Sequence, residues 1–252
     1  MTARMTVYRA LCALGFAMAS WSSAARAQPD AGDGFMFHAP RGGLSLRIGY
    51  ARPSADSKVF DFVSKQLTVG KGDFAGGSIA ADVEIPVATR AAVLVGAAIS
   101  ARAAQSEYRN FVDNNDLPIE QRTEFRRVPL SLGVKYYLAP PGRALSRLAW
   151  VPATVAPYVA AGGGWTYYSF RQSGDFVDFK TLDVFTSTMQ SYGWSSAMYA
   201  ATGVHYGLSA HADLVTEARY DRSRAPMSND FQGFDRISLS GLSLTAGVHF
   251  RF

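Results

Sequence analysis

The sequence predicts an all-β protein, an eight-stranded antiparallel transmembrane up-and-down β-barrel. Three observations support this: a leader-like first segment, eight segments of alternating apolar and polar residues, and a last residue that is aromatic. The 252 residues are 48% hydrophobic and 13% aromatic, which is enough to bury a core and argues against disorder. A mean hydropathy of essentially zero argues against a bundle of apolar membrane helices.

The first 27 residues are predicted to be a cleaved secretory signal peptide. A basic start is followed by a short apolar run over 11–21, and Ala25 and Ala27 form the small-residue pattern of a cleavage site. The apolar run is too short to span the roughly 30 Å of a bilayer core. The only cysteine, Cys12, lies in this segment, so no disulfide is expected in the remaining chain.

Charge balance argues against a nucleic-acid partner. The whole sequence has a net charge of +5, but the predicted signal peptide holds three basic residues and no acidic ones. The rest of the chain therefore has 22 basic and 20 acidic residues, a net charge of about +2. The expected organisation is a signal peptide at 1–27, a short periplasmic segment at 28–42 and a barrel at 43–252.

Eight segments alternate between apolar and polar residues, as strands with two different faces do. They lie at 43–52, 74–86, 92–103, 122–138, 155–170, 196–207, 212–221 and 237–252. In the fourth segment, every second residue from Val128 to Leu138 is apolar, whereas Arg127 and Lys135 lie on the other face. The last segment alternates in the same way, but Gly241 interrupts it and predicts a bulge or bend.

Two closed barrels fit this alternation, a soluble one with an apolar interior and a membrane one with an apolar exterior. The polar face is rich in Gly, Ala and Ser with few charges, whereas a soluble exterior would carry many Lys and Glu. The apolar face has no charge in the middle of any segment, as lipid contact requires, because an Arg or Lys there costs about 2–4 kcal/mol. The sequence therefore favours the membrane barrel over a soluble, lipocalin-like binder.

The connections between predicted strands alternate in length. They are roughly 21, 5, 18, 16, 25, 4 and 15 residues long, which is typical of outer-membrane barrels with long outer loops and short periplasmic turns. Four long surface loops and two periplasmic chain ends are therefore expected. The exception is 139–154, a periplasmic link that is too long for a tight turn and is expected to be a solvated excursion.

Aromatic residues on the apolar face are expected to form girdles at both membrane interfaces. The outer girdle would hold Tyr50, Tyr167 and Tyr220, and the inner girdle Tyr136, Tyr206, Phe250 and Phe252. Aromatic residues in the long connections are expected to pack the loops together, with contact to an outside partner as the alternative. They are Phe176, Phe179, Tyr192, Trp194, Phe231 and Phe234.

Charges on the polar face are predicted to form ion pairs that plug the barrel. Placing the first two strands side by side sets Arg47 almost opposite Asp82, with Glu84 one step away, and a buried charge is costly unless it is paired. A second set is expected nearer the outer mouth, either paired or hydrated at the rim: Arg102, Arg127, Glu217 and Arg219. Eight strands leave an interior that side chains just fill, so no general diffusion pore is expected.

The C-terminal segment TAGVHFRF is predicted to be an outer-membrane assembly signal. A polar residue, a glycine, a hydrophobic residue and a terminal aromatic stand at Thr245, Gly247, Phe250 and Phe252. The outer-membrane assembly machinery reads a last strand with an apolar outer face and a terminal aromatic. It is therefore an expected partner.

The segments RRVPLSLGVKYYLAP (126–140), APYVAAGGGW (156–165) and the terminal TAGVHFRF resemble strands of a known superfamily. They are similar to the central and final strands of the eight-stranded outer-membrane barrels of the OmpA, OmpW and opacity-protein type. The resemblance covers essentially the whole chain after the predicted signal peptide. It implies the same barrel fold and a location in the outer membrane of a Gram-negative cell.

No catalytic residue, cofactor or metal site is predicted. None of the histidines, His38, His205, His211 and His249, is followed two residues later by Ser, as in barrels of the lipid A deacylase type. The sequence also shows no His/Cys cluster with metal-ligand spacing. Its glycine-rich segments lie in strands rather than before helices, so they are not expected to bind phosphate.

The sequence thus predicts a non-enzymatic outer-membrane protein whose loops have a structural or surface-interaction role. The alternative is a passive channel for small hydrophobic compounds, as in the OmpW-like branch, which requires an apolar mouth opening laterally between strands. A lipid A-modifying enzyme would require a Ser-His-acid group on the lipid face. The expected partners are outer-membrane lipid and lipopolysaccharide and an extracellular ligand at the loops, and the chain is expected to be a monomer.

Overall fold

The computed structural model describes residues 34–113, 116–146, 149–179, 181 and 183–252. The predicted signal peptide with Ala25 and Ala27, and the first part of the segment 28–42, lie outside the described residues. Among the described residues, no helix has both the length and the hydrophobicity needed to cross a lipid bilayer.

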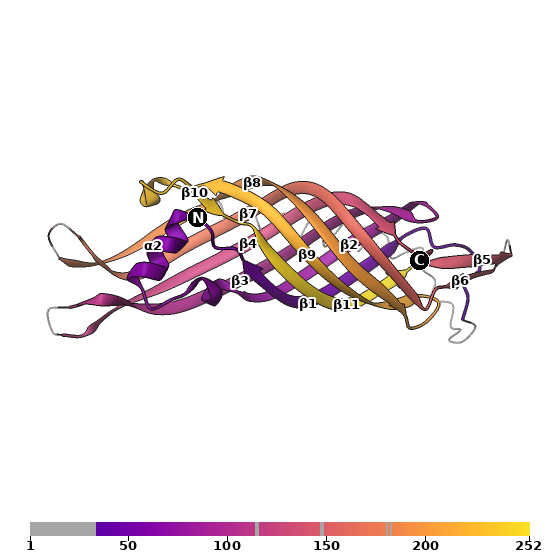
Figure 1. Ribbon diagram of the computed structural model, residues 1–252, viewed down its shortest axis with the longest axis horizontal. Helices are drawn as coiled ribbons and strands as arrows, with labels where there is room; N and C mark the ends of the chain where they lie inside the picture. The colour runs from indigo at the N-terminus through magenta and orange to yellow at the C-terminus, as the bar shows by residue number, and fades with distance from the viewer. Residues whose placement is uncertain (1–33, 114–115, 147–148, 180, 182) are drawn as a thin grey trace, which may run out of the picture. The chain divides into compact units, whose positions relative to one another are not determined.

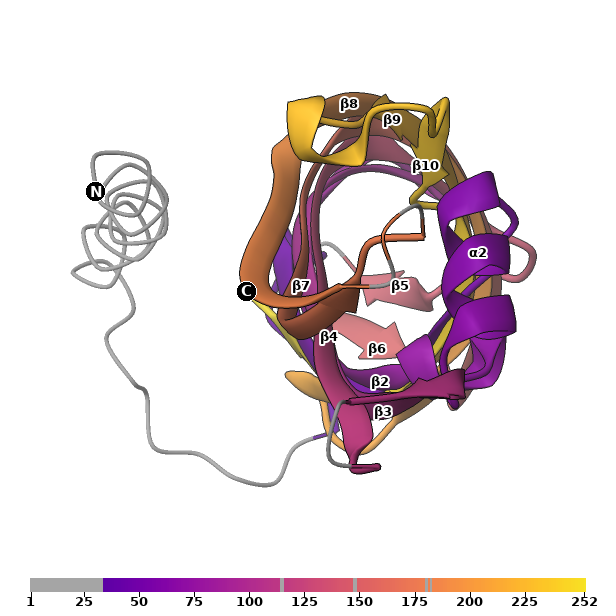
Figure 2. The same cartoon turned by 90° about the vertical axis from the view of Figure 1, so that its left-hand side faces the viewer.

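Eight antiparallel strands close into a ring (Figures 1 and 2), which confirms the predicted eight-stranded up-and-down barrel. Each strand pairs with the next along the chain, and the last pairs with the first. The strands are β1 (Gly43–Pro53), β2 (Gly76–Ala88), β3 (Ala91–Val112), β4 (Pro118–Tyr137), β7 (Val155–Val177), β8 (Val184–Gly207), β9 (Ala212–Pro226) and β11 (Gly241–Arg251).

Shorter elements decorate the two ends of the barrel. One end, called here the helix end, holds α2 (Lys58–Gln66), the 3₁₀ turns η1 (Lys71–Phe74) and η2 (Asn229–Phe231), and β10 (Arg236–Ser238), which pairs with β9. The other, called the Phe252 end, holds the hairpin of β5 (Gly142–Ser146) and β6 (Ala149–Pro152). The predicted excursion at 139–154 is this hairpin, and Met36 pairs with it through two backbone hydrogen bonds of 2.8 Å to Trp150.

The prediction of four long loops is wrong for two of them, the β3–β4 and β7–β8 connections. There the strands of the sheet simply continue. β7 and β8 stay paired as far as Val177 and Val184, so the predicted connection of roughly 25 residues is only the segment between those two residues. β3 and β4 likewise extend to Val112 and Pro118. The apolar and polar alternation that revealed the strands reflects contact with lipid. It fades in these extensions, where the buried inner face holds polar side chains such as Ser106 and Gln121 as well as apolar ones.

Helix α2 lies in the first long connection, where the sequence predicted a loop. Its buried residues are Val59, Phe60 and Val63, which recur at the spacing of one helical face. Phe60 is fully buried, and its ring meets those of Phe74, Phe125 and Phe170 edge to face, with centroids 5.0, 5.4 and 5.8 Å apart. We call these four phenylalanines and the apolar residues around them the helix-end core.

The loop aromatics divide between packing and exposure. Phe176 and Phe231 are buried, and Phe231 packs on Phe170 of the helix-end core. Phe179 and Phe234 contact Phe62 of α2, although Phe179 is about half exposed. The helix end is therefore one packed layer of chain rather than a set of separate loops.

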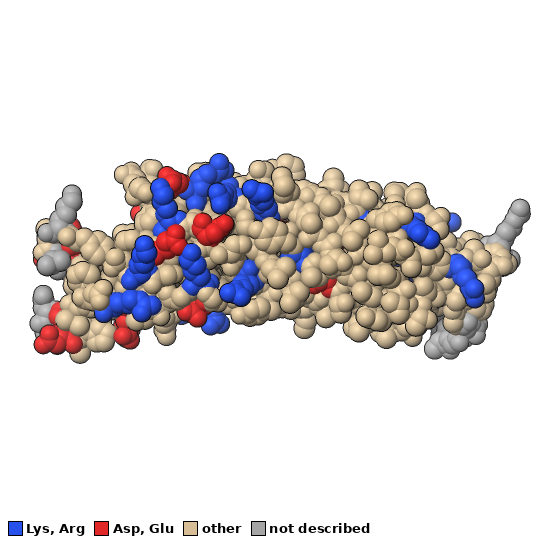
Figure 3. Space-filling model, in the orientation of Figure 1, with Lys and Arg blue, Asp and Glu red and all other residues tan. Residues whose placement is uncertain are grey.

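The barrel wall carries an apolar exterior and a polar interior. Ile48, Leu132 and Met198 are 70%, 59% and 63% exposed, whereas Arg47, Glu84 and Lys135 are buried. Aromatic residues of both predicted girdles are exposed on the same outer face, among them Tyr50, Tyr220, Tyr136, Tyr206, Phe250 and Phe252. Figure 3 shows charged side chains gathered over the helix end, with few over the wall beyond it. This arrangement is the reverse of a soluble barrel with an apolar interior.

Candidate functional site

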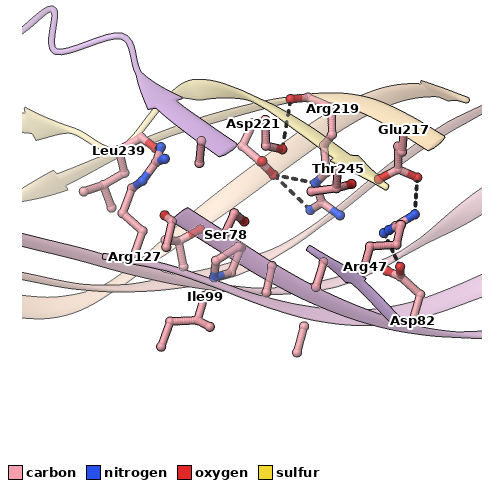
Figure 4. A pocket seen from close by; sticks show the side chains of 18 residues that line it. Arg47, Ser78, Asp82, Ile99, Arg127, Glu217, Arg219, Asp221, Leu239 and Thr245 are labelled. Atoms are coloured by element: carbon pink, nitrogen blue, oxygen red, sulfur yellow. Dashed lines mark hydrogen bonds and ion pairs between the residues drawn. The ribbon is translucent and has the colours of Figure 1, made fainter. Parts of the chain in front are cut away.

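The middle of the barrel interior holds an ion-paired group centred on Arg47 of β1 (Figure 4). Its guanidinium donates one hydrogen bond to Asp82 of β2 and another, of 2.8 Å, to Oε2 of Glu217 on β9. The hydroxyl of Tyr158 on β7 donates to the same Glu217 oxygen at 2.8 Å. All four side chains are buried, so one arginine bridges two carboxylates away from bulk water.

The predicted register of β1 and β2 is wrong by two residues. Arg47 lies opposite Ala80, and Asp82 lies opposite Ser45. Arg47 still reaches Asp82, because a long side chain can contact the diagonal neighbour on the same face of an antiparallel pair. Glu84, expected one step from Arg47, pairs instead with a different cation.

That cation is Lys135 of β4, a strand separated from the β2 strand of Glu84 by β3. Its ammonium lies 2.7 Å from Oε2 of Glu84 and 3.2 Å from Nε2 of His205. The hydroxyl of Tyr137 donates to the other Glu84 oxygen at 2.8 Å, and the ammonium lies 4.3 Å from the ring centroid of Tyr158. Sequence reasoning placed Lys135 on the polar face but did not include it among the ion pairs.

Two histidines extend this network toward the Phe252 end. Nδ1 of His205 lies 3.1 Å from Oδ2 of Asp213, and the other Asp213 oxygen accepts from Arg251. Nδ1 of His249 lies 2.9 Å from Oγ of Ser45, and the two imidazole rings meet edge to face at 4.7 Å. These side chains come from β1, β8, β9 and β11, so no local spacing in the sequence could reveal them.

Glu84, His205 and His249 are the described residues that could hold a metal ion, because their ligand atoms all lie within 4.8 Å of one another. The sequence prediction that no such group exists missed this cluster. The ammonium of Lys135, however, contacts both Glu84 and His205 at hydrogen-bonding distance. A second cation there would be repelled by the first, so this network is built around a lysine.

Serine, histidine and acid are present in the network, but they do not form one catalytic triad. Ser45 contacts His249, whereas Asp213 contacts His205, so the acid orients a different imidazole from the one beside the hydroxyl. Ser45 and His249 are also buried, at 2% and 4% exposure. The set lies inside the barrel, whereas a lipid A-modifying site was expected on the lipid face.

The predicted second set of charges does not form a single cluster. Glu217 belongs to the Arg47 group, while Arg219 pairs with Asp221 at 2.9 Å and covers the ring of Tyr199 at 3.8 Å. Arg127 is buried and donates to the carbonyl oxygens of Leu239 and Ser240 at 2.8 and 3.4 Å. Arg102 is exposed and donates to the carbonyl oxygen of Asp73 at 3.3 Å.

A cavity of about 40 Å³ lies between the Arg47 group and Arg127 (Figure 4). It is large enough for a few water molecules and is lined mainly by polar groups and alanines. On one side it reaches Ile99 and Pro129 in the wall. There the β3–β4 pairing is interrupted between Ala97↔Leu130 and Ser100↔Arg127, because proline has no N–H to donate.

The four residues of the predicted assembly signal all lie on β11 or directly after it. Thr245 is buried facing the interior, whereas Phe250 and Phe252 are exposed on the outer face. Gly247 lies opposite Arg47, where an added side chain would meet the backbone oxygen of Leu46. The carbonyl oxygen of Phe252 accepts hydrogen bonds from the backbone N–H groups of residues 41 and 42 at 2.7 and 3.0 Å.

No protein-family description and no curated protein matches the sequence. Several solved structures of outer-membrane and surface proteins are similar to the chain. Neisserial surface protein A is 16% identical, with 84% of this chain and 97% of that one covered and a TM-score of 0.45. The outer membrane protein OprG from Pseudomonas aeruginosa is 15% identical, with coverages of 86% and 99% and a TM-score of 0.45.

The outer membrane protease OmpT from Escherichia coli is also similar, at 12% identity, coverages of 88% and 99% and a TM-score of 0.32. By their names, these proteins include both an enzyme and proteins not named as enzymes. The likeness therefore concerns the barrel architecture, which the strand pairing of this chain displays by itself.

Proposed function

We propose that this chain is a non-enzymatic outer-membrane protein whose helix end faces the outside of the cell as an ordered interaction surface. The apolar exterior and the two aromatic girdles suit insertion in a bilayer. The helix end carries the long hairpins, whereas β2 and β3 are joined at the opposite end by a tight turn, as in outer-membrane barrels. This orientation leaves Phe252 on the periplasmic side.

The observation that carries this proposal is the closure of the barrel at two levels. The helix-end core fills the mouth, with Phe60, Phe125 and Phe170 fully or almost fully buried. Below it, the Arg47 group crosses the interior and leaves a cavity of only about 40 Å³. A closed barrel with a packed outer surface suits contact with other molecules better than passage of solutes.

Planar-bilayer recording tests the closed barrel. Purified protein is expected to insert without large, steady conductance, and its folded form should migrate differently from the heated form in gels. Open-channel conductance in every insertion event would contradict the closed barrel. Recovery of the protein in the soluble periplasmic fraction would contradict the membrane location itself.

The absence of enzymatic activity is part of the proposal. Ser45 has no route to a substrate through the described interior, since it is almost fully buried and does not line the cavity. Cells that express the protein should therefore have lipid A of unchanged mass, and a fluorophosphonate probe should not label Ser45. Labelling that disappears in a Ser45→Ala variant would identify an enzyme.

A second candidate function, a lateral conduit for small hydrophobic compounds, is favoured by one observation. The cavity touches the wall at Pro129, where the β3–β4 pairing is interrupted. A Pro129→Thr variant restores a donor at this position. Reduced uptake of a small alkane or aromatic compound in cells with this variant would support the conduit, and unchanged uptake would support the interaction surface.

A further inference from the structure

The outer face of β8, β9, β11 and β1 carries a groove that crosses all four strands. It measures about 580 Å³ and has one row formed by Ile48, Ala246, Thr216 and Val204, which lie opposite one another in successive strand pairs. The next row toward the helix end is Tyr50, Leu244, Ala218 and Thr202. We call it the four-strand groove.

The floor of the four-strand groove is formed by small side chains, and larger apolar ones flank it. Ala246, Thr216 and Ala218 lie in neighbouring strands, whereas Ile48 and Tyr50 project beside them and are 70% and 55% exposed. A channel of this kind on the lipid-facing wall has room for a hydrocarbon chain. Apolar shape by itself does not choose among lipids.

Arginines follow the groove toward the helix end, Arg52 in the next row and Arg222 and Arg224 farther along. Arg52 follows Tyr50 by two residues on β1, and Arg222 and Arg224 follow Tyr220 on β9, so all three continue the lipid-facing phase of their strands. All three are exposed. Figure 3 shows basic side chains gathered over this side of the helix end, with fewer acidic ones among them.

These arginines are mostly without partners in the chain. Among the residues that the structure describes, neither Arg52 nor Arg222 forms an ion pair, and Arg224 has one exposed contact of 3.4 Å with Asp56. Unpaired guanidinium groups beside an apolar belt favour phosphate, which they bind in a fork-like geometry. The groove and the arginines thus match the two parts of one molecule, a hydrocarbon chain and an anionic headgroup next to it.

We infer that the four-strand groove and Arg52, Arg222 and Arg224 form a binding site for a phosphorylated glycolipid of the lipid A type. This inference rests on the proposed membrane orientation, which places the arginines at the outer leaflet, where this lipid is the phosphate carrier. An acyl chain lies in the groove beside Ala218 and Ala246. The arginines on β1 and β9 stand on both sides of β11, which suits a headgroup with two phosphates.

Native mass spectrometry of the full chain in phosphatidylcholine nanodiscs tests this site, with bisphosphorylated lipid A as the added probe. The Arg52→Ala/Arg222→Ala variant should bind lipid A at least about tenfold more weakly, because it loses two charge-assisted contacts. Ala218→Phe, which fills the groove with an apolar ring, should weaken binding while both arginines remain. Arg126→Ala is the matched control, because Arg126 is an exposed outward arginine on β4, away from the groove.

Each outcome decides between this site and a named alternative. Equal binding by the wild-type and double-arginine proteins, or an equal loss with Arg126→Ala, would overturn the site. Phosphatidylglycerol or dephosphorylated lipid A binding as tightly as lipid A would overturn the assignment to a phosphorylated glycolipid. Gel mobility reports insertion separately, so a chain that never reaches its folded form in nanodiscs contradicts the proposed membrane location as well.

Discussion

Lys135 and Glu84 lie on β4 and β2, two strands separated by β3, and their charged atoms are 2.7 Å apart inside the barrel. The pair therefore joins strands that share no backbone hydrogen bond. It connects in turn to His205 and, through Tyr158, to the Arg47 group. The interior is thus one polar network, and removing any member should lower the stability of the whole barrel.

Replacing Lys135 by Met should destabilise the barrel by about 3–5 kcal/mol, because Glu84 would remain buried without its cation. Urea unfolding in lipid vesicles, followed by tryptophan fluorescence, measures this change. The Lys135→Met/Glu84→Gln double variant should recover part of the loss. A single variant as stable as the wild type would show that the site is hydrated rather than dry.

Arg47→Ala should also cost about 3–5 kcal/mol, since it leaves two buried carboxylates, Asp82 and Glu217, without a shared cation. Arg47→Lys should cost less than Arg47→Ala but should not be neutral, because the guanidinium uses two separate nitrogens, one for each carboxylate, whereas lysine has a single nitrogen. The same unfolding assay applies. Arg143→Ala, at an exposed position in the β5–β6 hairpin, is the control and should leave stability unchanged.

Phe60→Ala should loosen the helix end by about 3–5 kcal/mol while the membrane-spanning barrel stays folded. Phe60 is fully buried, whereas Phe62 on the same helix is 37% exposed, so Phe62→Ala should have a smaller effect. Limited trypsin digestion should cleave the Phe60 variant within α2, after Lys58 or Lys65, while its gel mobility shift persists. Equal protection of the two variants would mean that the core does not hold α2 in place.

At alkaline pH, loss of the proton from the Tyr108 hydroxyl should contribute to unfolding of the helix end. Burial raises the pKa of this tyrosine above 10.0, and hydrogen bonds from the backbone of Val177 and from Gln121 oppose the shift. The folded helix end therefore keeps a proton that the unfolded chain has lost. This stabilisation is complete below about pH 10 and falls as pH rises through the raised pKa. Trypsin sensitivity measured against pH should change less steeply in Tyr108→Phe.

Phe252→Ala should reduce the amount of folded protein in the outer membrane severalfold, if the terminal aromatic is read during assembly. This substitution keeps the backbone carbonyl that accepts the two hydrogen bonds near the chain start, so a loss would be due to the ring. The fraction of heat-modifiable protein in membranes measures the effect, and Phe252→Tyr should retain assembly. Normal amounts of folded Phe252→Ala protein would remove the case for a C-terminal assembly signal.

The strands were predictable because lipid contact imposes alternation. In β4, apolar residues at every second position from Val128 to Leu138 defined both the strand and its outer face. The register was not predictable to the same degree. A shift of two residues keeps every side chain on its own face, so alternation alone could not distinguish Asp82 from Ala80 as the partner opposite Arg47.

The interior network was predictable only in part. Charges had to pair somewhere, but the choice of Lys135 for Glu84 depends on how far each strand is staggered around the closed ring. His205, Asp213 and His249 carried no sequence signal, since their neighbours in the chain are ordinary strand residues. Helix α2 carried a signal, the apolar spacing of Val59, Phe60 and Val63, which a loop prediction overlooked.

The long β7–β8 hairpin determines how far the protein projects beyond the rim of the membrane-spanning barrel. From Tyr167 at the rim to Val177, β7 rises by ten residues, about 33 Å along the strand and about 25 Å in height at a tilt of about 40°. With the helix end outward, an approaching antibody or neighbouring cell meets the tip of this hairpin, including the half-exposed Phe179, well before it meets lipid. A substitution at Phe179 would therefore leave the side chains of the lipid-facing wall in place.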